Sequence, residues 1–335
     1  MNLTRRINAF GKLGNYINAI DEVTLDEISL SARNQNSWFT KENIRQAFQA
    51  LTKYTKEENL ISWTSQYNLE PLHPKTVAVV MAGNIPLVGF HDLISVLISG
   101  HRIQIKLSSK DSYLMNFIIR KLIEIEPGFN NYISLSEQLR NFDAVIATGS
   151  DNSSRYFHYY FDKYPHIIRK NRSSCAILTG FESDEELTDL GKDVFSYFGL
   201  GCRNVSKIYI PKEFDFDRLF KSWSVYEDVM MHHKYHNNYD YQKSIMLVNR
   251  VPFLDTGFVL LQENTQFVSP ISVLFYEYYE DWNTLLQKID AFRDKIQCVV
   301  GNAKPAQVRI GQAQSPELWN YADQVDTLKF LETLN

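Results

Sequence analysis

The chain has 335 residues, of which 44% are hydrophobic and 22% are charged, and its formal net charge is −4. This length allows two ordinary cores, and the small net charge excludes the basic footprint of a protein that binds nucleic acid or an anionic membrane. No run of about 20 apolar residues predicts a membrane span, and no apolar signal-peptide core follows Met1, so we expect a cytoplasmic protein with a small or neutral partner.

The first half of the chain alternates between expected strands and helices. Roughly the first 70 residues favour helices; Thr40, for example, can cap a segment with helical spacing of apolar residues. Apolar, β-branched runs then predict strands, and segments bracketed by proline, serine or glycine predict helices. The strands are expected at 76–81, 102–107, 143–147 and 174–179, and the helices at 86–99, 112–124 and 150–163. This order predicts a doubly wound, Rossmann-type α/β domain.

A second α/β unit is expected beyond Asp184, with a less regular order. We expect helices from 184 to about 198 and at 216–230, and strands at 207–210, 258–262, 271–276 and 296–300. A last strand at 306–310 could cross back to the first domain. The predicted domains are therefore a cofactor domain at 1–183, which 302–335 rejoins, and a catalytic domain at 184–301.

Three cysteines are too few and too widely spaced for a disulfide framework or a zinc site with CxxC pairs. Cys175 and Cys298 lie in expected buried strands, where cysteine is usually a small hydrophobe. Cys202 instead follows Gly199-Leu200-Gly201, a turn that can present it, and precedes an arginine. A nearby cation or backbone N–H groups can lower a thiol pKa. Cys202 is therefore the candidate nucleophile.

Four segments resemble, in order, consecutive blocks of aldehyde dehydrogenases. They are Gly83-Asn84-Ile85-Pro86-Leu87, the run from Ser99 to Ser109, Ala147-Thr148-Gly149-Ser150, and Gly199-Leu200-Gly201-Cys202-Arg203. Residues 195–207 resemble the LuxC-type acyl-CoA reductase branch of that superfamily, and the similarity runs from about residue 70 to the C-terminus. The resemblance implies an aldehyde dehydrogenase-like fold, with a Rossmann-type cofactor domain and a second α/β catalytic domain.

The resemblance also implies a reaction. Cys202 would attack the thioester of an acyl-CoA or acyl carrier protein, and the thioacyl-enzyme would be reduced to an aldehyde. The side chain of Asn84 and the backbone N–H of Cys202 would form the oxyanion hole, whose donors are each worth about 2.7–4 kcal/mol. The alternative interpretation of Asn84 is a turn residue between strand and helix. A homo-oligomer or an acyl-transfer partner is possible.

The expected cofactor is NADPH, with NADH possible. Neither GxGxxG nor GxxxxGK[ST] occurs, but the resembled superfamily binds its dinucleotide without them. By resemblance, Lys106 would contact the adenosine ribose, and Thr148, Gly149 and Ser150 would lie near the pyrophosphate. A helix that begins at Ser150 would also offer free N–H groups to phosphate. The alternatives are a solvated lysine at the end of a strand and a plain helix N-cap.

Two positions depart from the resembled pattern. The glutamate that activates water in hydrolytic aldehyde dehydrogenases should fall near residues 169–172, where no carboxylate stands. The glutamate that holds the nicotinamide ribose is matched by Gln266. The missing carboxylate favours an acylating reductase over aldehyde oxidation, which stays an alternative. Gln266 leaves the orientation of the cofactor open and keeps an inactive scaffold of the same fold as another alternative.

His232, His233 and His236 form an HHxxH motif. On a helix His232 and His236 would share a face, which is a metal-binding spacing. No glutamate or third ligand accompanies them, so we favour an active-site wall or a surface position and expect no metal. Because histidine titrates near neutrality, His233 is the candidate acid for the leaving thiolate or the nascent alkoxide.

Overall fold

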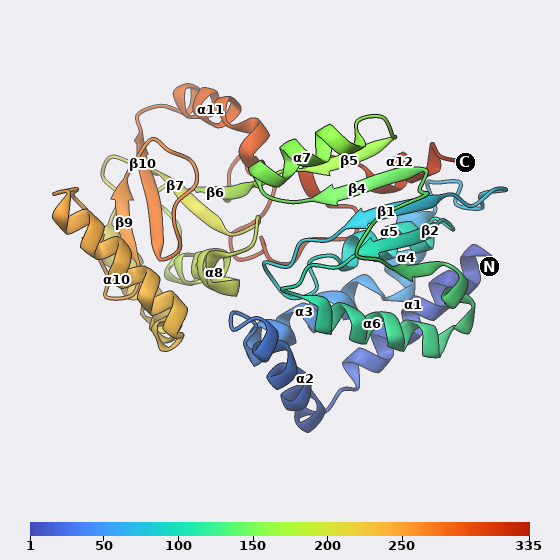
Figure 1. The fold of residues 1–335 in the computed structure, drawn as a ribbon. Helices are drawn as coiled ribbons and strands as arrows, with labels where there is room; N and C mark the ends of the chain where they lie inside the picture. Colours follow the sequence, from blue (N-terminus) through green and yellow to red (C-terminus); the bar gives the residue numbers. More distant parts are fainter. The chain divides into compact units, whose positions relative to one another are not determined.

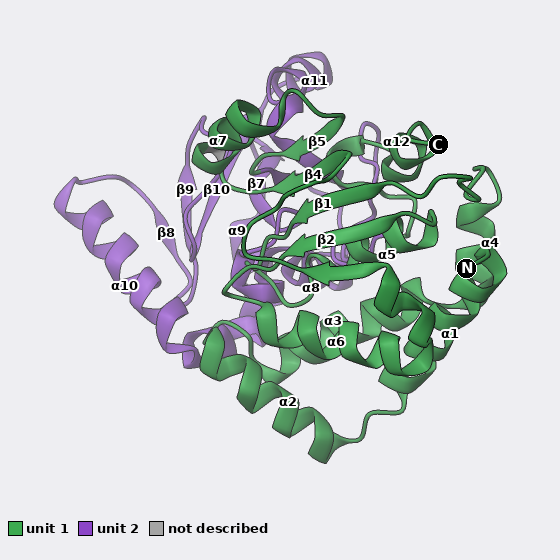
Figure 2. Ribbon diagram, turned by 45° about the vertical axis from the view of Figure 1, so that its right-hand side comes forward, with its two compact units in different colours: residues 1–171, 317–335 green, residues 172–316 purple. Residues whose placement is uncertain are grey.

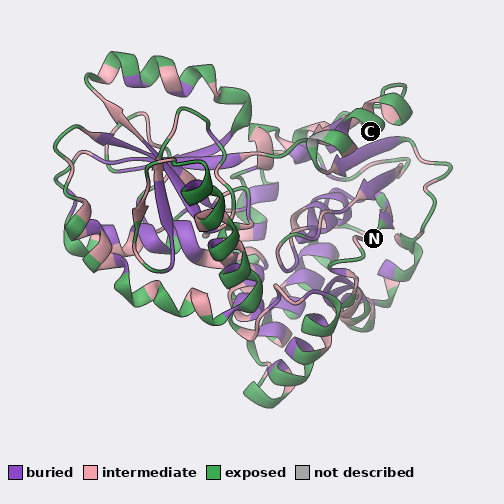
Figure 3. Cartoon of the chain, turned by 60° about the vertical axis from the view of Figure 1, so that its left-hand side comes forward, coloured by how far each residue is buried: buried purple, intermediate pink, exposed green. Residues whose placement is uncertain are grey.

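The computed structural model describes residues 1–335, except for the side chain of Asp151. Residues 1–171 and 317–335 form one compact unit, and residues 172–316 form a second (Figure 2). Each unit has a sheet and an apolar core of its own, with buried strands and exposed outer helix faces (Figure 3). Among the described residues, no helix is long and apolar enough to cross a membrane.

The first unit is built on five parallel strands in the order β3-β2-β1-β4-β5 (Figure 1). They are β1 (Thr76–Val80), β2 (Arg102–Lys106), β3 (Ile133–Leu135), β4 (Ala144–Thr148) and β5 (His166–Arg169). After β1 the chain adds β2 and β3 on one side and then β4 and β5 on the other. The switch point of this doubly wound sheet therefore lies between β1 and β4, as predicted for a Rossmann-type domain.

Helices cover both faces of this sheet. They are α1 (Leu3–Asn18), α2 (Glu22–Gln35), α3 (Lys41–Tyr54), α4 (Glu57–Thr64), α5 (Phe90–Ile98), α6 (Ser112–Ile125), α7 (Asp151–Phe161) and α12 (Thr327–Glu332), with short 3-10 turns at Pro127–Asn131 and Ala322–Gln324. Alternate residues of β1 face opposite sides, as the two-residue period of a strand requires. Val77 and Val79 join the large core with α1, α5 and α6, whereas Ala78 joins a smaller core with Val145 and Phe157 of α7.

The second unit has a six-stranded sheet in the order β11-β6-β7-β10-β9-β8, parallel except for the β8–β9 pair. Its strands are β6 (Ser173–Ile177), β7 (Val205–Pro211), β8 (Leu254–Asp255), β9 (Leu260–Glu263), β10 (Val273–Tyr279) and β11 (Ile296–Val300). Its helices are α8 (Asp184–Phe195), α9 (Phe216–Trp223), α10 (His233–Val248) and α11 (Trp282–Ala291), with 3-10 turns at Ser196–Gly199, Ser224–Met231 and Arg293–Lys295.

The unit boundaries differ from the predicted ones at 183 and 301. The strand expected at 174–179 within the first domain is β6, which pairs with β7 and β11 of the second sheet. Local apolar pattern identifies such a strand but does not decide which sheet it joins, because that choice depends on long-range pairing.

The strand expected at 306–310 does not return to the first domain. Val308 forms an isolated bridge with Val300, and the carboxylate of Asp193 accepts hydrogen bonds from the backbone N–H groups of Gly311 (2.7 Å) and Ala313 (2.9 Å). These contacts hold the segment in the second unit. The chain rejoins the first unit only from Glu317 onward.

Candidate active site

Cys202 lies on an exposed turn of the second unit, between the 3-10 turn at Ser196–Gly199 and β7. Three consecutive residues before it have left-handed backbone conformations: Tyr197 (φ 52°), Phe198 (φ 57°) and Gly199 (φ 76°). Glycine adopts this conformation without strain, but a tyrosine or phenylalanine does so at a cost of about 1–3 kcal/mol each. The surrounding structure must therefore hold this turn in place.

Asn204 holds the turn through its side chain, which is buried. Its Oδ1 accepts a hydrogen bond from the N–H of Gly201 (2.8 Å). Its Nδ2 donates to the backbone carbonyls of Asp193 (3.1 Å), Val194 (3.3 Å) and Ser196 (2.9 Å). These carbonyls lie at the C-terminal end of α8, where a helix leaves its last carbonyl groups without intrahelical partners. One side chain thus joins the end of α8 to the turn that carries Cys202.

The other two cysteines lie in the core of the second unit. Cys175 in β6 is fully buried and Cys298 in β11 is 4% exposed, and burial raises the pKa of both thiols. Ser174 joins this core to the turn, because its hydroxyl donates to the carbonyl oxygen of Cys202 (3.1 Å) and lies 3.1 Å from the sulfur of Cys298. Thiolate chemistry at either buried cysteine is disfavoured, whereas Cys202 is accessible.

The histidine motif lies at the start of α10. His232 is the N-cap of this helix, where its Nδ1 accepts from the N–H of Tyr235 (3.4 Å), and His236 lies one turn further on. The ring of His232 is buried and lies 4.5 Å from that of Phe198, in the turn that leads to Cys202. His233 is exposed and stacks on His232 at 5.1 Å. The catalytic role of His233 stays a prediction, and His232 is the histidine that packs against the turn.

Gln266 lies on an exposed segment after β9, and a buried lysine holds the backbone of this segment. The buried ammonium of Lys207 donates to the carbonyls of Asn264 (3.0 Å) and Gln266 (3.2 Å) and pairs with Glu277. Burial would raise the pKa of Glu277, but hydrogen bonds from Lys207 and Lys288 keep it below its usual value. Asn264 and Glu277 also line an open pocket of about 580 Å³ in this unit. Lys207 thus fixes the position of the Gln266 backbone.

The predicted cofactor residues of the first unit lie at the carboxyl edge of its sheet. Thr148 is the last residue of β4 and borders the switch point, and Lys106 is the exposed last residue of β2, paired in register with Val80 of β1. Open α/β sheets bind ligands outside the carboxyl ends of their strands at such a switch point. The sequence prediction and the topology therefore point to the same edge.

Gly149 and Ser150 form the tight connection from β4 to α7. A Cβ atom at Gly149 would lie 2.7 Å from the ring of Phe157 and 2.8 Å from the Cβ of Ser153, so no larger residue fits without displacement. Ser150 is the N-cap of α7 and accepts a hydrogen bond from the N–H of Ser153 (3.2 Å). Its expected position at the start of a helix is confirmed, and its contact with a phosphate stays a prediction.

Asn84 is exposed on the loop between β1 and α5. The helix expected from Pro86 begins only at Phe90, because Leu87 has φ 57° and its N–H donates to Oδ2 of Asp111 (2.8 Å). Asp111 is 1% exposed, and burial raises its pKa to about 8. A buried carboxyl group with a raised pKa therefore anchors the loop that carries Asn84.

The segment matched to the missing glutamate, residues 169–172, begins with an arginine in a buried ion pair. Arg169, the last residue of β5, contacts both carboxylate oxygens of Asp92 in α5 (2.7 and 2.8 Å) and donates to the hydroxyl of Thr327 in α12 (3.1 Å). A buried pair of this kind is strongly destabilised when one partner is removed. At this position the chain has a structural cation in place of a catalytic base.

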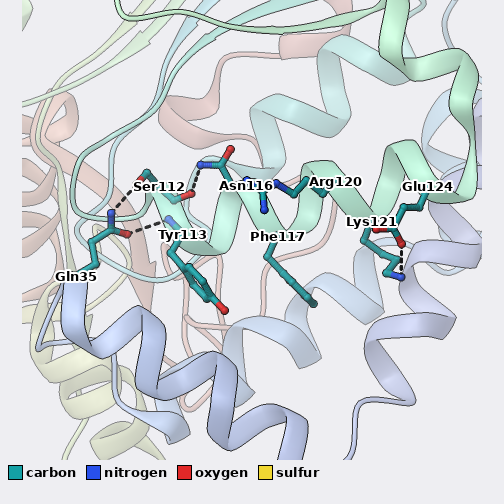
Figure 4. Close-up of a pocket in the computed structure, with 8 residues that line it drawn as sticks. All are labelled: Gln35, Ser112, Tyr113, Asn116, Phe117, Arg120, Lys121 and Glu124. Atoms are coloured by element: carbon teal, nitrogen blue, oxygen red, sulfur yellow. Dashed lines mark hydrogen bonds and ion pairs between the residues drawn. The ribbon is translucent and has the colours of Figure 1, made fainter.

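The first unit also has an open pocket of about 400 Å³ (Figure 4). It is lined by Gln35 of α2 and by residues of α6: Ser112, Tyr113, Asn116, Phe117, Arg120, Lys121 and Glu124. Gln35 accepts from the N–H of Tyr113 (2.9 Å) and donates to the hydroxyl of Ser112, so its amide is used to join the two helices. None of the predicted site residues lines this pocket.

Solved aldehyde dehydrogenases have the same fold. The NAD⁺ complex of the Bacillus cereus aldehyde dehydrogenase matches with a TM-score of 0.64 at 12% identity, over 90% of this chain and 72% of that one. Aldehyde dehydrogenase 21 from Physcomitrella patens, in complex with succinate, matches with a TM-score of 0.68 at 11% identity, over 99% and 84%. The protein is thus an α/β protein of the aldehyde dehydrogenase fold.

Within that fold the chain belongs to the LuxC acyl-CoA reductase family, whose model matches residues 13–215. It is similar to the long-chain acyl-protein thioester reductase of Photorhabdus laumondii, 22% identical over 146 residues, which are 39% of this chain and 30% of that protein. The Aliivibrio fischeri protein of the same name is 23% identical over 153 residues, 41% of this chain and 32% of that one. The matches thus span about a third of these relatives.

We expect Asn204→Ala to destabilise the second unit by about 2–4 kcal/mol, because it leaves the Gly201 N–H and several buried carbonyl groups without their partner. Urea unfolding of the full chain measures this change. The control is Asn283→Ala, an exposed asparagine of α11. Equal stability of the two variants would mean that Asn204 does not hold the turn.

Asp111 should give the protein a stability that falls as pH rises. Its pKa in the folded state, about 8, exceeds the usual value, so between about pH 4 and 8 the folded state keeps a proton that the unfolded chain releases. The free energy of unfolding should fall by up to about 1.4 kcal/mol per pH unit in this window.

Asp111→Asn should remove this pH dependence, since an amide can still accept from Leu87 but cannot ionise. Chemical unfolding of wild type and variant at several pH values measures the difference, with the exposed Asp26→Asn as control. A difference between wild type and Asp111→Asn that does not change with pH would contradict the assignment.

Proposed function

We propose that this chain is an NADPH-dependent acyl-thioester reductase, with NADH as a possible substitute, and that Cys202 is its nucleophile. The observation that carries the proposal is the turn at Cys202. Its backbone is strained, Asn204 and Ser174 hold it, and it exposes the thiol, whereas the other two cysteines are buried. Membership of the LuxC family and the names of the curated relatives support a thioester of CoA or of an acyl protein as the substrate.

The acylation step needs a thiolate and a place for negative charge. The sulfur of Cys202 attacks the thioester carbonyl, the carbonyl oxygen becomes an oxyanion, and collapse expels the CoA or carrier thiolate. We assign the oxyanion donors to the Cys202 N–H and the Asn84 side-chain amide, each worth about 2.7–4 kcal/mol. His233 is our candidate for the acid that protonates the leaving thiolate or, after reduction, the alkoxide.

The carboxyl edge of the first sheet fits a dinucleotide. The connection at Gly149 is too tight for a side chain, and the N-terminus of α7 offers backbone N–H groups to a pyrophosphate. Sheets of this type that use NAD commonly place an acidic residue against the ribose 2′-hydroxyl. Here β2 ends in Lys106, and Ser108 and Ser109 lie two and three residues further on. A cation and two hydroxyl groups suit a 2′-phosphate better than a 2′-hydroxyl. When bound, the nicotinamide supplies the hydride that reduces the thioacyl group.

The fate of the thioacyl-enzyme follows from the missing base. A general base accelerates water attack by about 10²–10⁴-fold, and the matching position is occupied by the buried Arg169–Asp92 pair. Water is then a poor nucleophile toward the thioacyl group. In the first route the thioacyl group is reduced to a thiohemiacetal, which releases an aldehyde and restores the Cys202 thiolate. In the second route the acyl group is transferred to a free thiol, which needs no base to attack.

Cofactor oxidation with a panel of acyl-CoAs of increasing length tests this function. We expect aldehyde formation by the wild type, loss of turnover in Cys202→Ala, and retained turnover in Cys175→Ala and Cys298→Ala, since only Cys202 is exposed. Mass spectrometry identifies the product. Equal activity in all three variants would refute Cys202 as the nucleophile. Abundant free acid formed from an aldehyde and the oxidised cofactor without CoA would indicate a hydrolytic enzyme.

A second experiment tests the cofactor. Lys106→Ala should weaken NADPH binding about tenfold, as expected for the loss of one charge-assisted hydrogen bond, and should change NADH binding less. Fluorescence titration of both cofactors measures the two affinities. The exposed Lys56→Ala is the control. An equal loss for NADPH and NADH would assign Lys106 to a part that both cofactors share.

A further inference from the structure

A second group of side chains, which have ligand atoms for a metal ion, lies where α7 ends and β5 begins. His158 is in the last turn of α7, Asp162 is its C-cap, and His166 is the first residue of β5. This position is at the amino end of β5. It is therefore at the edge of the first sheet opposite the carboxyl ends of β2 and β4, where Lys106 and Thr148 lie.

The three side chains bring their ligand atoms together. His158 Nδ1 lies 2.8 Å from Asp162 Oδ1, and His166 Nε2 lies 3.7 Å from the same oxygen. One ligand atom from each residue lies within 4.8 Å of the other two. Zinc–ligand bonds of about 2.0–2.1 Å place the ligand atoms of a tetrahedral site about 3.3 Å apart. The two measured distances bracket that value, and the third, between the two histidines, is at most 4.8 Å, so side-chain movements of an ångström or two would complete the geometry.

His166 is already oriented as a metal ligand. Its Nδ1 lies 2.9 Å from the carbonyl oxygen of Tyr164, and because a carbonyl can only accept, Nδ1 carries the proton. In the neutral ring the lone pair is then on Nε2, the atom that faces Asp162. Metal-bound histidines are usually held by a hydrogen bond of this kind from their second nitrogen.

The position also suits a cation. The C-terminal end of α7 carries the negative end of the helix dipole, and Asp162 adds a carboxylate. The side chains of His158, Asp162 and His166 are 43%, 61% and 27% exposed, so an ion can enter and water can complete its coordination. The rings of the two histidines are nearly perpendicular, at 85°, and do not stack.

We propose that His158, Asp162 and His166 bind one divalent transition-metal ion, with zinc as the best-fitting class. Two imidazole nitrogens and one carboxylate oxygen are ligands that zinc accepts, and three protein ligands leave a fourth position for water. On binding, the neutral His158 ring changes tautomer: Nδ1 gives its proton to water, Nε2 takes one up from water, and the metal occupies the place of the lost proton between Nδ1 and Asp162. The ion ties the end of α7 to the start of β5.

Isothermal titration of the chelator-treated full chain with zinc chloride tests the site. We expect one equivalent to bind, and His166→Ala, His158→Gln and Asp162→Asn each to weaken binding at least about tenfold. His158 and Asp162 are exposed enough that their variants should fold even if His166→Ala does not. The matched control is His236→Ala, because His236 and Asp240 form a similar pair four residues apart that has no third ligand among the described side chains.

Zinc also binds thiolates, so the titration is repeated with Cys202→Ser. The proposal expects unchanged binding in this variant, and a rise in melting temperature with zinc that is lost in Asp162→Asn. Binding that disappears in Cys202→Ser and persists in the three site variants would overturn the proposal. So would the absence of stoichiometric binding in the wild type.

Discussion

The candidate site depends on the hydrogen bonds that the side-chain amide of Asn204 makes. This amide satisfies carbonyl groups at the end of α8 and the N–H of Gly201 at the same time. A helix end and a strained turn each have backbone groups that need partners, and one buried amide serves both. Because the turn is fixed at Asn204 and at the carbonyl of Cys202, the strain at Tyr197 and Phe198 is sustained by the second unit as a whole.

In the first unit a buried carboxyl group fixes a loop in a similar way. Asp111 accepts a hydrogen bond from the N–H of Leu87, so α5 does not begin at Pro86 and Asn84 lies on an exposed loop. In the second unit, the buried Lys207 donates to the carbonyl of Gln266 and so holds the segment that carries it. In each case a buried polar group, costly to bury unless it is hydrogen-bonded, fixes backbone outside the regular elements. The positions of Asn84, Cys202 and Gln266 are thus set by neighbours that have no part in the proposed chemistry.

Periodicity predicted most strands of both units, because strands buried on both faces are nearly continuous apolar runs, but it missed the helices α10 and α11 of the second unit. It could not assign β6 to its sheet, since pairing partners lie far along the chain. Sequence reasoning could find the candidate nucleophile through the glycines before Cys202, but it could not find the residues that hold the turn. Asn204 and Lys207 lie within residues 195–207, which resemble the LuxC-type branch, but that resemblance gave neither residue a role. The one local signal was a lysine inside the apolar strand Val205–Pro211, a position that demands a buried partner such as Glu277.

The buried Arg169–Asp92 pair explains why a general base would be hard to restore at the matching position. A glutamate in place of Arg169 would face the carboxylate of Asp92 in a site with little solvent, and the lost cation would also leave Thr327 of α12 without its partner. Two like charges in such a site cannot both ionise, so one carboxyl would stay protonated and could not act as a base at neutral pH. Packing of the first unit therefore opposes a carboxylate base at this position, whatever the chemistry at Cys202.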